Sequence, residues 1–465
     1  MSALGGIRPA AMMGLAEAAR SLPARLEGGD VAFSGVSTDS RTVSAGDLFV
    51  ALEGERFDGH AYVAEAVRRG AVAAMVSKPV DTALPVARLA VVDTRFALGR
   101  LAALWRARFR LPLVALTGSN GKTTVKEMLT AILAVHCGSR EAVLATAGNL
   151  NNDIGMPLTL LRLAPTHRFA VIEMGMNHEG EIEYLTRIAQ PTVALVNNAQ
   201  RAHVGMLGSI EAIARAKGEI YAGLGEHGQA VVNLDDAFAP YWKGLNAGRP
   251  IVTFGFASDA DVRAESAGDA GWRFTTPAGS FEAALQVAGE HNARNALAAC
   301  AAAHALAVPV AAMRSALAAF AGVPGRLQRR RGPAGSTVID DTYNANPESM
   351  KAALKVLAAA PGRRVFVMGD MGELGPQAPA MHAEVGEFAR RVGIDALLAL
   401  GPESRHAAQA FGANGRHFAD AGAIEEAALA EARAGATLLV KGSRFMRMER
   451  VAQALAREGG EADAL

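Results

Sequence analysis

Residues 117–124 carry the strongest chemical signal in this chain of 465 residues, because they read Thr-Gly-Ser-Asn-Gly-Lys-Thr-Thr. They follow the apolar run 113–116, which predicts a buried strand, and they precede residues 125–133, where apolar side chains recur at helical spacing. A glycine-rich loop between a strand and a helix is typical of phosphate-binding loops. The loop is a variant, because Leu116 stands where the usual motif has its first glycine. The alternative interpretation is a plain glycine turn.

The residue types in this loop suit a nucleotide. Gly118 and Gly121 allow backbone N–H groups to turn toward an anion, and the N-terminus of the following helix adds partial positive charge. Lys122 adds a full positive charge, and Thr123 offers a hydroxyl ligand to Mg²⁺. We therefore expect the loop to bind the phosphates of ATP together with Mg²⁺. The predicted nucleotide-binding residues of the loop are Gly118, Ser119, Asn120, Gly121, Lys122, Thr123 and Thr124.

Two further candidate metal ligands follow other apolar runs. Glu173 comes directly after the run 169–172, and His203 lies in the loop after the run 192–196. In open parallel sheets, ligands bind outside the carboxyl ends of the strands, so both side chains are expected near the phosphate loop. A carboxylate and a neutral imidazole can each bind a metal ion. The alternatives are a capping or salt-bridged glutamate and a solvated histidine.

Lys217 falls within an apolar helical stripe over residues 209–224. A lysine that faces a core is costly unless its ammonium reaches solvent or is paired. Beside a Mg²⁺ site its positive charge would also repel the metal, whereas reaction with CO₂ to a carbamate would make the side chain negative. Carbamylated Lys217 is therefore one hypothesis, and a lysine that extends its ammonium to solvent is the other.

Other polar clusters occur at predicted strand ends and in loops. The segment 146–155 is rich in asparagine, which indicates hydrogen bonding to a polar ligand, with Asx turns and a helix cap as the alternative. Asn292 is a candidate cap of the helix that starts near it, and Asn346 precedes a proline in a typical helix start. Lys441 and Ser443 follow the last predicted strand and could hold an anion.

These residues are distributed over three predicted units: a small N-terminal α/β unit at 1–108, a central unit at 109–325 and a Rossmann-like C-terminal α/β unit at 326–465. Apolar runs alternate with helical stretches in the last two units, which indicates a doubly wound, mostly parallel central sheet and a smaller α/β unit after it. A hairpin within 272–287 and a helix over 292–307 are expected to complete the central unit. The predicted strands are 71–76 and 89–92, then 113–116, 169–174, 192–196, 230–234 and 250–254, and finally 336–340, 364–368, 396–400 and 437–440.

Composition narrows the class of protein. Half of the residues are apolar, a fifth are charged and the formal net charge is +1, so no long-range field gathers nucleic acid or an anionic membrane. The two cysteines, Cys137 and Cys300, argue against a disulfide framework and a zinc cluster, and they fit a reducing compartment. No signal peptide or membrane span is recognised in the sequence, so we expect a cytoplasmic protein that neither inserts into membranes nor binds nucleic acid.

The motifs together resemble those of one family. The chain resembles Mur ligases, the enzymes that build the peptide of peptidoglycan, over nearly its whole length. The phosphate loop is shared with folylpolyglutamate synthases, whereas the segments 343–347 and 369–375 resemble the dipeptide-adding member. One departure is the segment 204–207, Val-Gly-Met-Leu, where a Leu-Glu-Gly-Phe-like run is expected. The matching segments are 37–41, 117–124, 149–158, 173–175, 202–203, 216–219, 291–295, 324–326, 340–347 and 441–444.

The resemblance implies roles for the matching residues. Lys122 is expected to contact the terminal phosphates of ATP, and Thr123 and Glu173 to bind Mg²⁺. His203 and carbamylated Lys217 are expected to serve a second Mg²⁺, which makes Lys122, His203 and Lys217 the predicted catalytic residues. The other expected contacts are Asn292 and Asn295 with adenine, Arg326 and Asp341 with ATP, Ser37 and Arg41 with the uridine-diphosphate end of a substrate, and Thr146, Asn149, Asn152, Tyr343, Asn346, Lys441 and Ser443 with the substrates.

The resemblance also implies a reaction. The chain is expected to join D-alanyl-D-alanine to UDP-N-acetylmuramoyl-tripeptide through an acyl phosphate, using ATP and Mg²⁺, as a monomer. Closure of the C-terminal unit about Arg326 is expected to keep the acyl phosphate from water. Two alternatives stay open, another amide ligase of the same family and a nucleotide-switch protein that performs no ligation.

Overall fold

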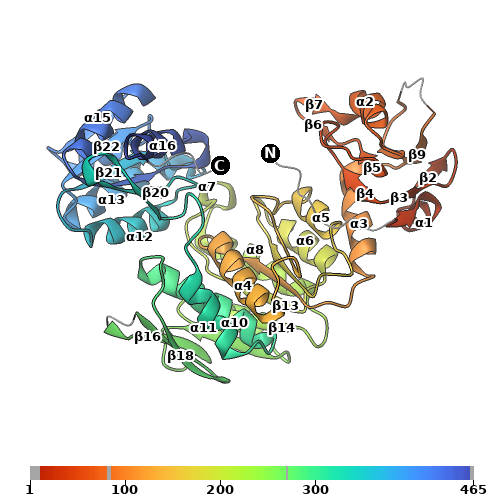
Figure 1. The fold of residues 1–465 in the computed structure, drawn as a ribbon, viewed down its shortest axis with the longest axis horizontal. Coiled ribbons are helices and arrows are strands. Elements are labelled where there is room, and N and C mark those ends of the chain that lie inside the picture. The colour runs from red at the N-terminus through yellow and green to blue at the C-terminus, as the bar shows by residue number, and fades with distance from the viewer. Residues whose placement is uncertain (1–10, 81–84, 269–270, 461–465) are drawn as a thin grey trace.

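The computed structural model describes residues 11–80, 85–268 and 271–460, which form three α/β units in chain order (Figure 1). Among these residues, the main sheets have five strands in the N-terminal unit, nine in the central unit and six in the C-terminal unit. In Figure 1 the N-terminal unit, in red, and the C-terminal unit, in blue, lie on opposite sides of the view above the central unit. The predicted α/β architecture of the three units is confirmed.

The central sheet has the strand order β11-β12-β10-β13-β14-β15-β16-β17-β18. All neighbours from β11 to β16 are parallel, and β17 and β18 form the predicted hairpin at one edge. The chain leaves β10 toward β11 on one side and later adds β13 on the other, so the carboxyl end of β10 lies at the switch point of the sheet, where ligands bind. The strands are β10 (Leu113–Thr117), β11 (Val143–Ala145), β12 (Phe169–Glu173), β13 (Val193–Val196), β14 (Gln229–Asn233), β15 (Ile251–Gly255), β16 (Val262–Ser266), β17 (Trp272–Thr276) and β18 (Gly279–Ala283).

Alternating side chains of the central strands enter two apolar cores, one on each face of the sheet. In β10, Leu113 and Ala115 belong to one core and Val114 and Leu116 to the other. A parallel sheet carries this continuous apolar pattern because helices cover both of its faces. One face is covered by α4 (Lys122–Cys137), α10 (Glu290–Ala305) and α11 (Val310–Ala319), and the other by α3 (Thr94–Arg106), α5 (Gly155–Leu160), α6 (Glu181–Ala189) and α8 (Ile210–Gly218), with the short helices α7 (Val204–Leu207) and α9 (Ala239–Leu245) nearby.

Helix α3 joins the N-terminal unit to the central unit, and it was not expected from the sequence. The side chain of Asp93 caps its start, and Trp105 Nε1 donates a hydrogen bond to the carbonyl of Leu163 in the central unit. Strand β9 ends at Ala90, two residues before its predicted end, because the chain must leave the sheet to reach this cap. The other elements of this unit are β1 (Met13–Gly14), α1 (Leu15–Ser21), β2 (Arg25–Glu27), β3 (Ala32–Phe33), β4 (Gly35–Ser37), β5 (Asp47–Val50), β6 (Glu53–Gly54), β7 (Phe57–Asp58), α2 (Val63–Arg68), β8 (Ala73–Val76) and β9 (Ala87–Ala90).

The C-terminal sheet has the order β19-β20-β24-β21-β22-β23, and all neighbours except β19 and β20 are parallel. It also has an apolar core on each face. Asn346 starts α12 with a reciprocal capping box that includes Ser349, as the predicted helix start required. The elements are β19 (Gln328–Arg331), β20 (Thr337–Asp341), α12 (Pro347–Ala358), β21 (Arg364–Gly369), α13 (Ala378–Arg391), β22 (Ala396–Leu400), α14 (Arg405–Phe411), β23 (Gly415–Phe418), α15 (Ala421–Arg433), β24 (Thr437–Lys441) and α16 (Glu449–Glu458).

The predicted strands of the two larger units all occur, with bounds shifted by at most one residue. Helix α10 starts at Glu290, two residues before its predicted start, so Asn292 lies in its first turn and is not its cap. No helix in the described part of the chain is long and apolar enough to cross a membrane.

Candidate active site

A cavity of about 520 Å³ opens between the central and C-terminal units, at the carboxyl ends of their sheets. The loops after β10, β11 and β12 form its central wall, and the loops after β20, β21 and β24 form its C-terminal wall. The carboxyl ends of the strands, where ligands bind in such sheets, therefore face the same cavity from both units. The predicted site residues that line it are Ser119, Asn120, Gly121, Lys122, Thr123, Asn149, Asn152, Glu173, His203, Arg326, Tyr343 and Asn346.

The phosphate loop is braced from behind by amide side chains. Gly121 has φ +79°, and a Cβ there would lie 2.2 Å from Asn295 Oδ1, so only glycine fits. Asn197 Nδ2 donates to the carbonyl of Asn120 at 2.9 Å and to Asn295 Oδ1 at 3.1 Å. Lys122 Nζ donates to the carbonyl of Gly118 at 2.6 Å, at the start of α4. Asn295 therefore lies against the phosphate loop and supports it. Its predicted contact with adenine stays a prediction.

Glu173 lies next to this loop, at the end of β12. Thr123 Oγ1 donates to Glu173 Oε2 at 3.0 Å, and Asn151 Nδ2 donates to Glu173 Oε1 at 2.7 Å. Thr146 is buried beneath them, where its Oγ1 accepts the N–H of Glu173 and its carbonyl accepts a hydrogen bond from the buried Lys126. Thr146 does not line the cavity and supports Glu173 from behind, so its contact with a substrate stays a prediction.

Lys217 is a buried lysine in α8, with only 1% of its surface exposed. No carboxylate among the described residues pairs with its ammonium. Burial, and then the charge of Lys122, lower the pKa of Lys217 well below its usual value. The hypothesis of a lysine whose ammonium extends into solvent therefore disagrees with the structure, and a neutral amine near the phosphate loop agrees with it.

His203 lies at the start of α7, and its ring faces the C-terminal unit. Its Nδ1 is 2.6 Å from Glu373 Oε2, in the loop after β21, as an ion-pair contact rather than an aligned hydrogen bond. The contact with His203 lowers the pKa of the Glu373 carboxyl, and the more distant charge of Lys122 adds to this. Lys122 in turn has a lowered pKa because the surrounding protein partly shields its ammonium from solvent, while Glu173 opposes that shift.

Asp341, Lys441 and Ser443 stand behind the C-terminal wall and do not line the cavity. Lys441 Nζ is 2.6 Å from Asp341 Oδ2 and donates to the carbonyl of Asn344 at 2.8 Å. Ser443 Oγ accepts the N–H of Gly372 at 2.8 Å. These side chains hold the two loops that reach the cavity, so their direct contact with a ligand stays a prediction.

One pair of side-chain amides joins the phosphate loop to the C-terminal wall. Asn346 and Asn120 exchange hydrogen bonds through their side-chain amides, at 2.8 and 3.2 Å. At the same wall, the guanidinium of Arg326 lies 4.0 Å from the ring centroid of Tyr343, which holds the arginine over an aromatic face. The amide pair therefore holds the phosphate loop against the C-terminal wall.

The remaining predicted residues lie elsewhere. Ser37 and Arg41 belong to the N-terminal unit, outside the cavity, and Arg41 pairs with Asp39. Asn292 is buried in α10 and donates to the carbonyl of Ala288. The described structure brings together the phosphate loop, Glu173, His203 and the C-terminal wall. Lys217 and the residues expected at the uridine-diphosphate end do not line this cavity.

Arg201 and Glu373 are two residues of the interface and cavity that were not singled out from the sequence. Arg201 forms a bidentate contact with Glu384 and a third hydrogen bond with Glu348, both across the interface, and it lowers the pKa of Glu384 to about 2. Glu373 and Arg444 line the cavity. Both lie in segments that carry the family resemblance, 369–375 and 441–444, so the motifs themselves were the available signal.

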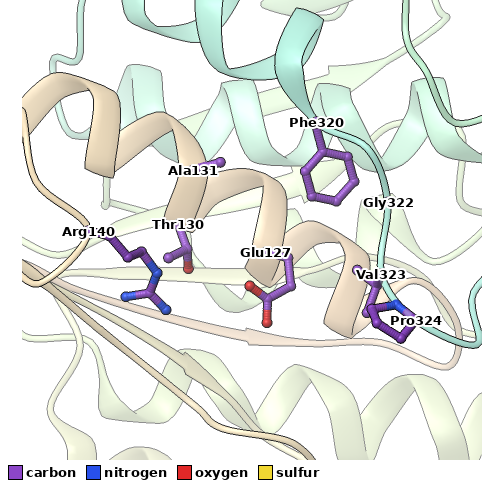
Figure 2. A pocket seen from close by; sticks show the side chains of 8 residues that line it. All are labelled: Glu127, Thr130, Ala131, Arg140, Phe320, Gly322, Val323 and Pro324. Atoms are coloured by element: carbon purple, nitrogen blue, oxygen red, sulfur yellow. The ribbon is translucent and has the colours of Figure 1, made fainter. Parts of the chain in front are cut away.

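A second cavity, of about 390 Å³, lies behind α4 and against the segment 320–324 that leads into the C-terminal unit (Figure 2). Its two charged side chains are Glu127 and Arg140. Glu127 pairs with Lys126, and Arg140 donates to the carbonyl of Val143, so both charges are used within the fold. None of the predicted site residues lines this cavity.

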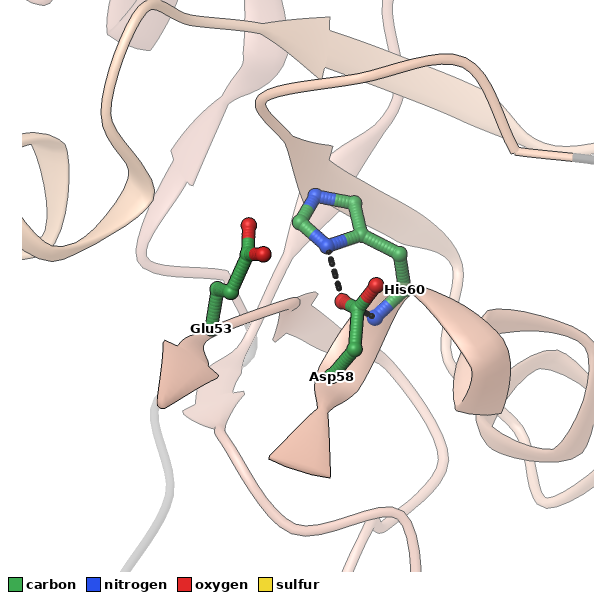
Figure 3. Close-up of side chains that lie close together, drawn as sticks. All are labelled: Glu53, Asp58 and His60. Carbon is green, nitrogen blue, oxygen red and sulfur yellow. Dashed lines mark hydrogen bonds and ion pairs between the residues drawn. The ribbon is translucent and has the colours of Figure 1, made fainter. Parts of the chain in front are cut away.

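Glu53, Asp58 and His60 bring three potential metal-ligand atoms within 4.8 Å of one another in the N-terminal unit (Figure 3). His60 Nδ1 is 2.6 Å from Asp58 Oδ1, and its Nε2 accepts the N–H of Ser77. Lys78 Nζ lies 2.7 Å from Asp58 and 3.2 Å from Glu53. Because both ring nitrogens are used and a lysine already balances the carboxylates, we interpret this cluster as a structural ion-pair network.

Known proteins match both the sequence and this arrangement. The Mur ligase family catalytic domain matches residues 32–106, the Mur ligase middle domain residues 116–303, and the Mur ligase glutamate ligase domain residues 325–444. The UDP-N-acetylmuramoyl-tripeptide–D-alanyl-D-alanine ligases of Escherichia coli and Haemophilus influenzae are 45% and 40% identical to the chain, each over 94% of the chain and 97% of the relative.

Solved structures agree with these relatives. MurF from Acinetobacter baumannii has a TM-score of 0.88 and 38% identity, covering 95% of this chain and 98% of its own. MurF from Thermotoga maritima, solved in complex with ADP, has a TM-score of 0.79 and 28% identity, covering 92% and 98%. Sequence, fold and the cavity between the two sheets all agree: the chain belongs to the Mur ligase family.

Proposed function

We propose that the chain joins D-alanyl-D-alanine to UDP-N-acetylmuramoyl-tripeptide and converts ATP to ADP and phosphate as it forms the amide bond. Relatives with this activity in their names match the chain over nearly its full length. The structural observation that carries the proposal is the cavity in which the phosphate loop and Glu173 face Arg326, Tyr343 and Glu373 of the C-terminal unit.

The nucleotide belongs at the phosphate loop. The backbone of residues 118–122, the N-terminus of α4 and the Lys122 ammonium form a positive cradle. Arg326, held over Tyr343, faces the cavity from the other wall. The ADP complex of the Thermotoga maritima relative supports this assignment. We place the adenine toward Asn292 and Asn295 at the start of α10, next to the same loop.

The residues around Glu173 fit Mg²⁺. The ion prefers oxygen ligands and carboxylates, and Thr123 Oγ1 and Glu173 Oε2 lie 3.0 Å apart beside the loop. When bound, Mg²⁺ neutralises phosphate charge and orients the γ-phosphate. His203 offers an imidazole for a second ion.

Lys217 is suited to carry a carbamate. Only a neutral amine reacts with CO₂, and burial of Lys217 favours the neutral form. The carbamate would supply the negative charge that this buried position lacks and an oxygen ligand for the second ion. A carbamate ¹³C signal in ¹³CO₂-enriched buffer that disappears in Lys217→Met supports the modification, and an unchanged spectrum contradicts it.

The chain's own groups then account for the reaction. A carboxylate and ATP repel each other, and the Lys122 charge lowers this repulsion as the carboxylate oxygen attacks the γ-phosphorus and ADP leaves. The resulting acyl phosphate has a good leaving group. The amine of the dipeptide attacks its carbonyl carbon, the tetrahedral intermediate expels phosphate, and the amide nitrogen loses a proton.

The C-terminal wall is proposed to hold the dipeptide and to exclude water. Tyr343 and Asn346 line the cavity, and Lys441 and Ser443 fix the loops that carry them. Ser37 and Arg41 are proposed to hold the uridine-diphosphate end from the N-terminal unit. Since the groups named above all come from one chain, we propose a monomer, acting in the cytoplasm where ATP is available.

The test is phosphate release from ATP with UDP-N-acetylmuramoyl-tripeptide, with and without D-alanyl-D-alanine, followed by mass analysis of the product. Release that needs both substrates, with a product heavier by one dipeptide unit, supports the proposal. Release indifferent to the dipeptide points to another amide ligase, and turnover without either substrate points to a nucleotide switch. Lys122→Ala should lower turnover by about 10²–10³-fold, as for other lost electrostatic stabilisers; near-normal turnover would contradict the role of Lys122.

A further inference from the structure

Glu373 is the one acidic side chain of the C-terminal wall that contacts His203, among the residues the structure describes. Its Oε2 is 2.6 Å from His203 Nδ1, and the Nδ1 atom is shielded from solvent. Both residues line the cavity next to Lys122 and Glu173. With Nδ1 turned to the carboxylate, Nε2 is the ring nitrogen that is available to a ligand.

Both partners of this contact have a strained backbone. His203 has φ +64° and Glu373 has φ +61°, a region that residues other than glycine rarely adopt. Neither position is filled by glycine, although glycine would remove the strain. Such strain persists where the surrounding structure holds it, and it concentrates at functional sites. The two strained residues meet each other from different units.

The backbone around the contact is locked as well. Gly205 N donates to the carbonyl of Glu373 at 2.9 Å. A Cβ on Gly205 would lie 2.5 Å from the N of Gly375. The two backbone segments therefore lie too close together for any side chain at position 205. Gly205 belongs to the segment 204–207, where this chain departs from the expected family pattern. Helix α7 reaches the C-terminal unit at this point in Figure 1.

We propose that Glu373 is a positioning residue, which orients the His203 imidazole through Nδ1 so that Nε2 faces the second metal ion. Histidine ligands in proteins commonly donate their other ring N–H to a carboxylate, which fixes the tautomer and strengthens the ligand. Here the carboxylate beside Nδ1 is that of Glu373, from the opposite unit, and the 2.6 Å approach is an ion-pair contact without hydrogen-bond alignment. Docking of the C-terminal unit therefore completes the metal site, and an undocked chain holds the second ion weakly. The inference rests on the proposed role of His203 as a ligand.

The experiment uses the full chain with Mn²⁺ in place of Mg²⁺ and a non-hydrolysable ATP analogue. Continuous-wave electron paramagnetic resonance counts the bound Mn²⁺, and pulsed spectra detect ¹⁴N coupling from a coordinating imidazole. In the wild type we expect two Mn²⁺ per chain and one imidazole coupling, which His203→Ala removes. Glu373→Ala should raise the dissociation constant of the second Mn²⁺ by about 10–100-fold, and Glu373→Gln should fall between Glu373→Ala and the wild type.

Matched variants distinguish the positioning of His203 by Glu373 from a general effect of docking between the central and C-terminal units. Glu348→Gln weakens another contact across the same interface, the one with Arg201, without touching His203. Its second Mn²⁺ should bind within about twofold of wild type, and an equal loss in Glu348→Gln and Glu373→Ala overturns the inference. Metal-free thermal unfolding of Glu373→Ala checks that the variant is folded, and Gly205→Ala, which blocks the close approach but keeps Glu373, should also weaken the second ion.

The remaining outcomes are distinct. If the wild type shows no imidazole coupling, His203 is not a ligand and the proposed metal role fails together with this inference. If the wild type shows the coupling and Glu373→Ala keeps both the coupling and the affinity, the metal role stands and the positioning role is wrong. Tighter Mn²⁺ binding in Glu373→Ala also overturns the inference, because Glu373 would then compete with the ion for His203.

Discussion

Lys217 of the central unit and Lys441 of the C-terminal unit are both buried lysines that do not line the cavity, and their surroundings are opposite. Lys441 pairs with Asp341 at 2.6 Å and donates to a backbone carbonyl. Lys217 has no carboxylate partner among the described residues. A buried charge that is paired and hydrogen-bonded stabilises the local structure, whereas an unpaired one is costly. The buried ammonium of Lys441 therefore already has its partners within the C-terminal unit. The amine of Lys217 in the central unit lacks a carboxylate partner, which a ligand or a modification can supply.

The largest effect expected from this comparison is on turnover in Lys217→Met. The variant removes the amine and keeps the apolar length of the side chain, so the ligase rate should fall by about 10²–10³-fold. The free energy of unfolding in urea should stay the same or rise, because methionine suits an apolar position better than an unpaired amine. Loss of stability together with normal turnover would contradict this, because Lys217 would then stabilise the fold and have no part in the reaction.

Lys441→Met should show the opposite pattern. It leaves the carboxylate of Asp341 buried without its partner, which typically costs about 3 kcal/mol or more of unfolding free energy. The double variant Lys441→Met with Asp341→Asn removes both charges and should recover part of this loss. Urea unfolding of the two variants is the measurement. If the single variant is as stable as the wild type, the Lys441–Asp341 pair does not hold the C-terminal wall.

A smaller effect concerns His291, which lies near this pair. Burial lowers its pKa to about 4, while Asp341 raises it and Lys441 lowers it further. Below the ordinary pKa of about 6.5 the unfolded chain binds a proton that the folded chain rejects, so stability is full above pH 6.5 and falls as the pH drops toward 4. By this linkage the loss amounts to about 2 kcal/mol at pH 5. His291→Gln should flatten that part of the curve, and an unchanged pH dependence would contradict the assignment.

The pH dependence of stability can also be measured in the Lys441→Met variant, where it tests how the Lys441–Asp341 pair acts on His291. Without the lysine, the Asp341 carboxylate faces His291 alone and its field raises the pKa of the imidazole. The pH-dependent loss of stability should then become smaller than in the wild type. A larger loss would contradict the assignment of this pH dependence to His291.

The strands and their ends could be predicted because each is a run of apolar residues followed directly by polar ones. Glu173 and Lys441 both close such runs, and both lie at the carboxyl ends of their sheets. The spacing of apolar residues and the polar residues that end each run are local properties of the chain. They can therefore be recognised in the sequence without knowledge of the fold. Helix α3 was missed although Leu98, Leu101, Ala102 and Trp105 recur at helical spacing, so the sequence did carry the signal for it.

The distinction between contact and support could not be predicted. The motif at 291–295 predicts that Asn295 faces a ligand, which stays a prediction; the structure adds that its Oδ1 accepts a hydrogen bond from Asn197 next to Gly121 of the phosphate loop. Thr146 likewise holds Glu173 from below. Contacts across the interface, such as Arg201 with Glu384, were also missed, because they join loops that are distant in sequence and depend on how the units dock.

The apolar core shared by the first two units has a mechanical consequence. One continuous core runs from Met12 in the N-terminal unit through α3 to Trp242 in the central unit, whereas the C-terminal unit has two cores of its own. The first two units should therefore melt as one cooperative block, and the third as another. The N-terminal unit should therefore keep a fixed position on the central unit, whereas we expect the C-terminal unit to be the part that can change its position.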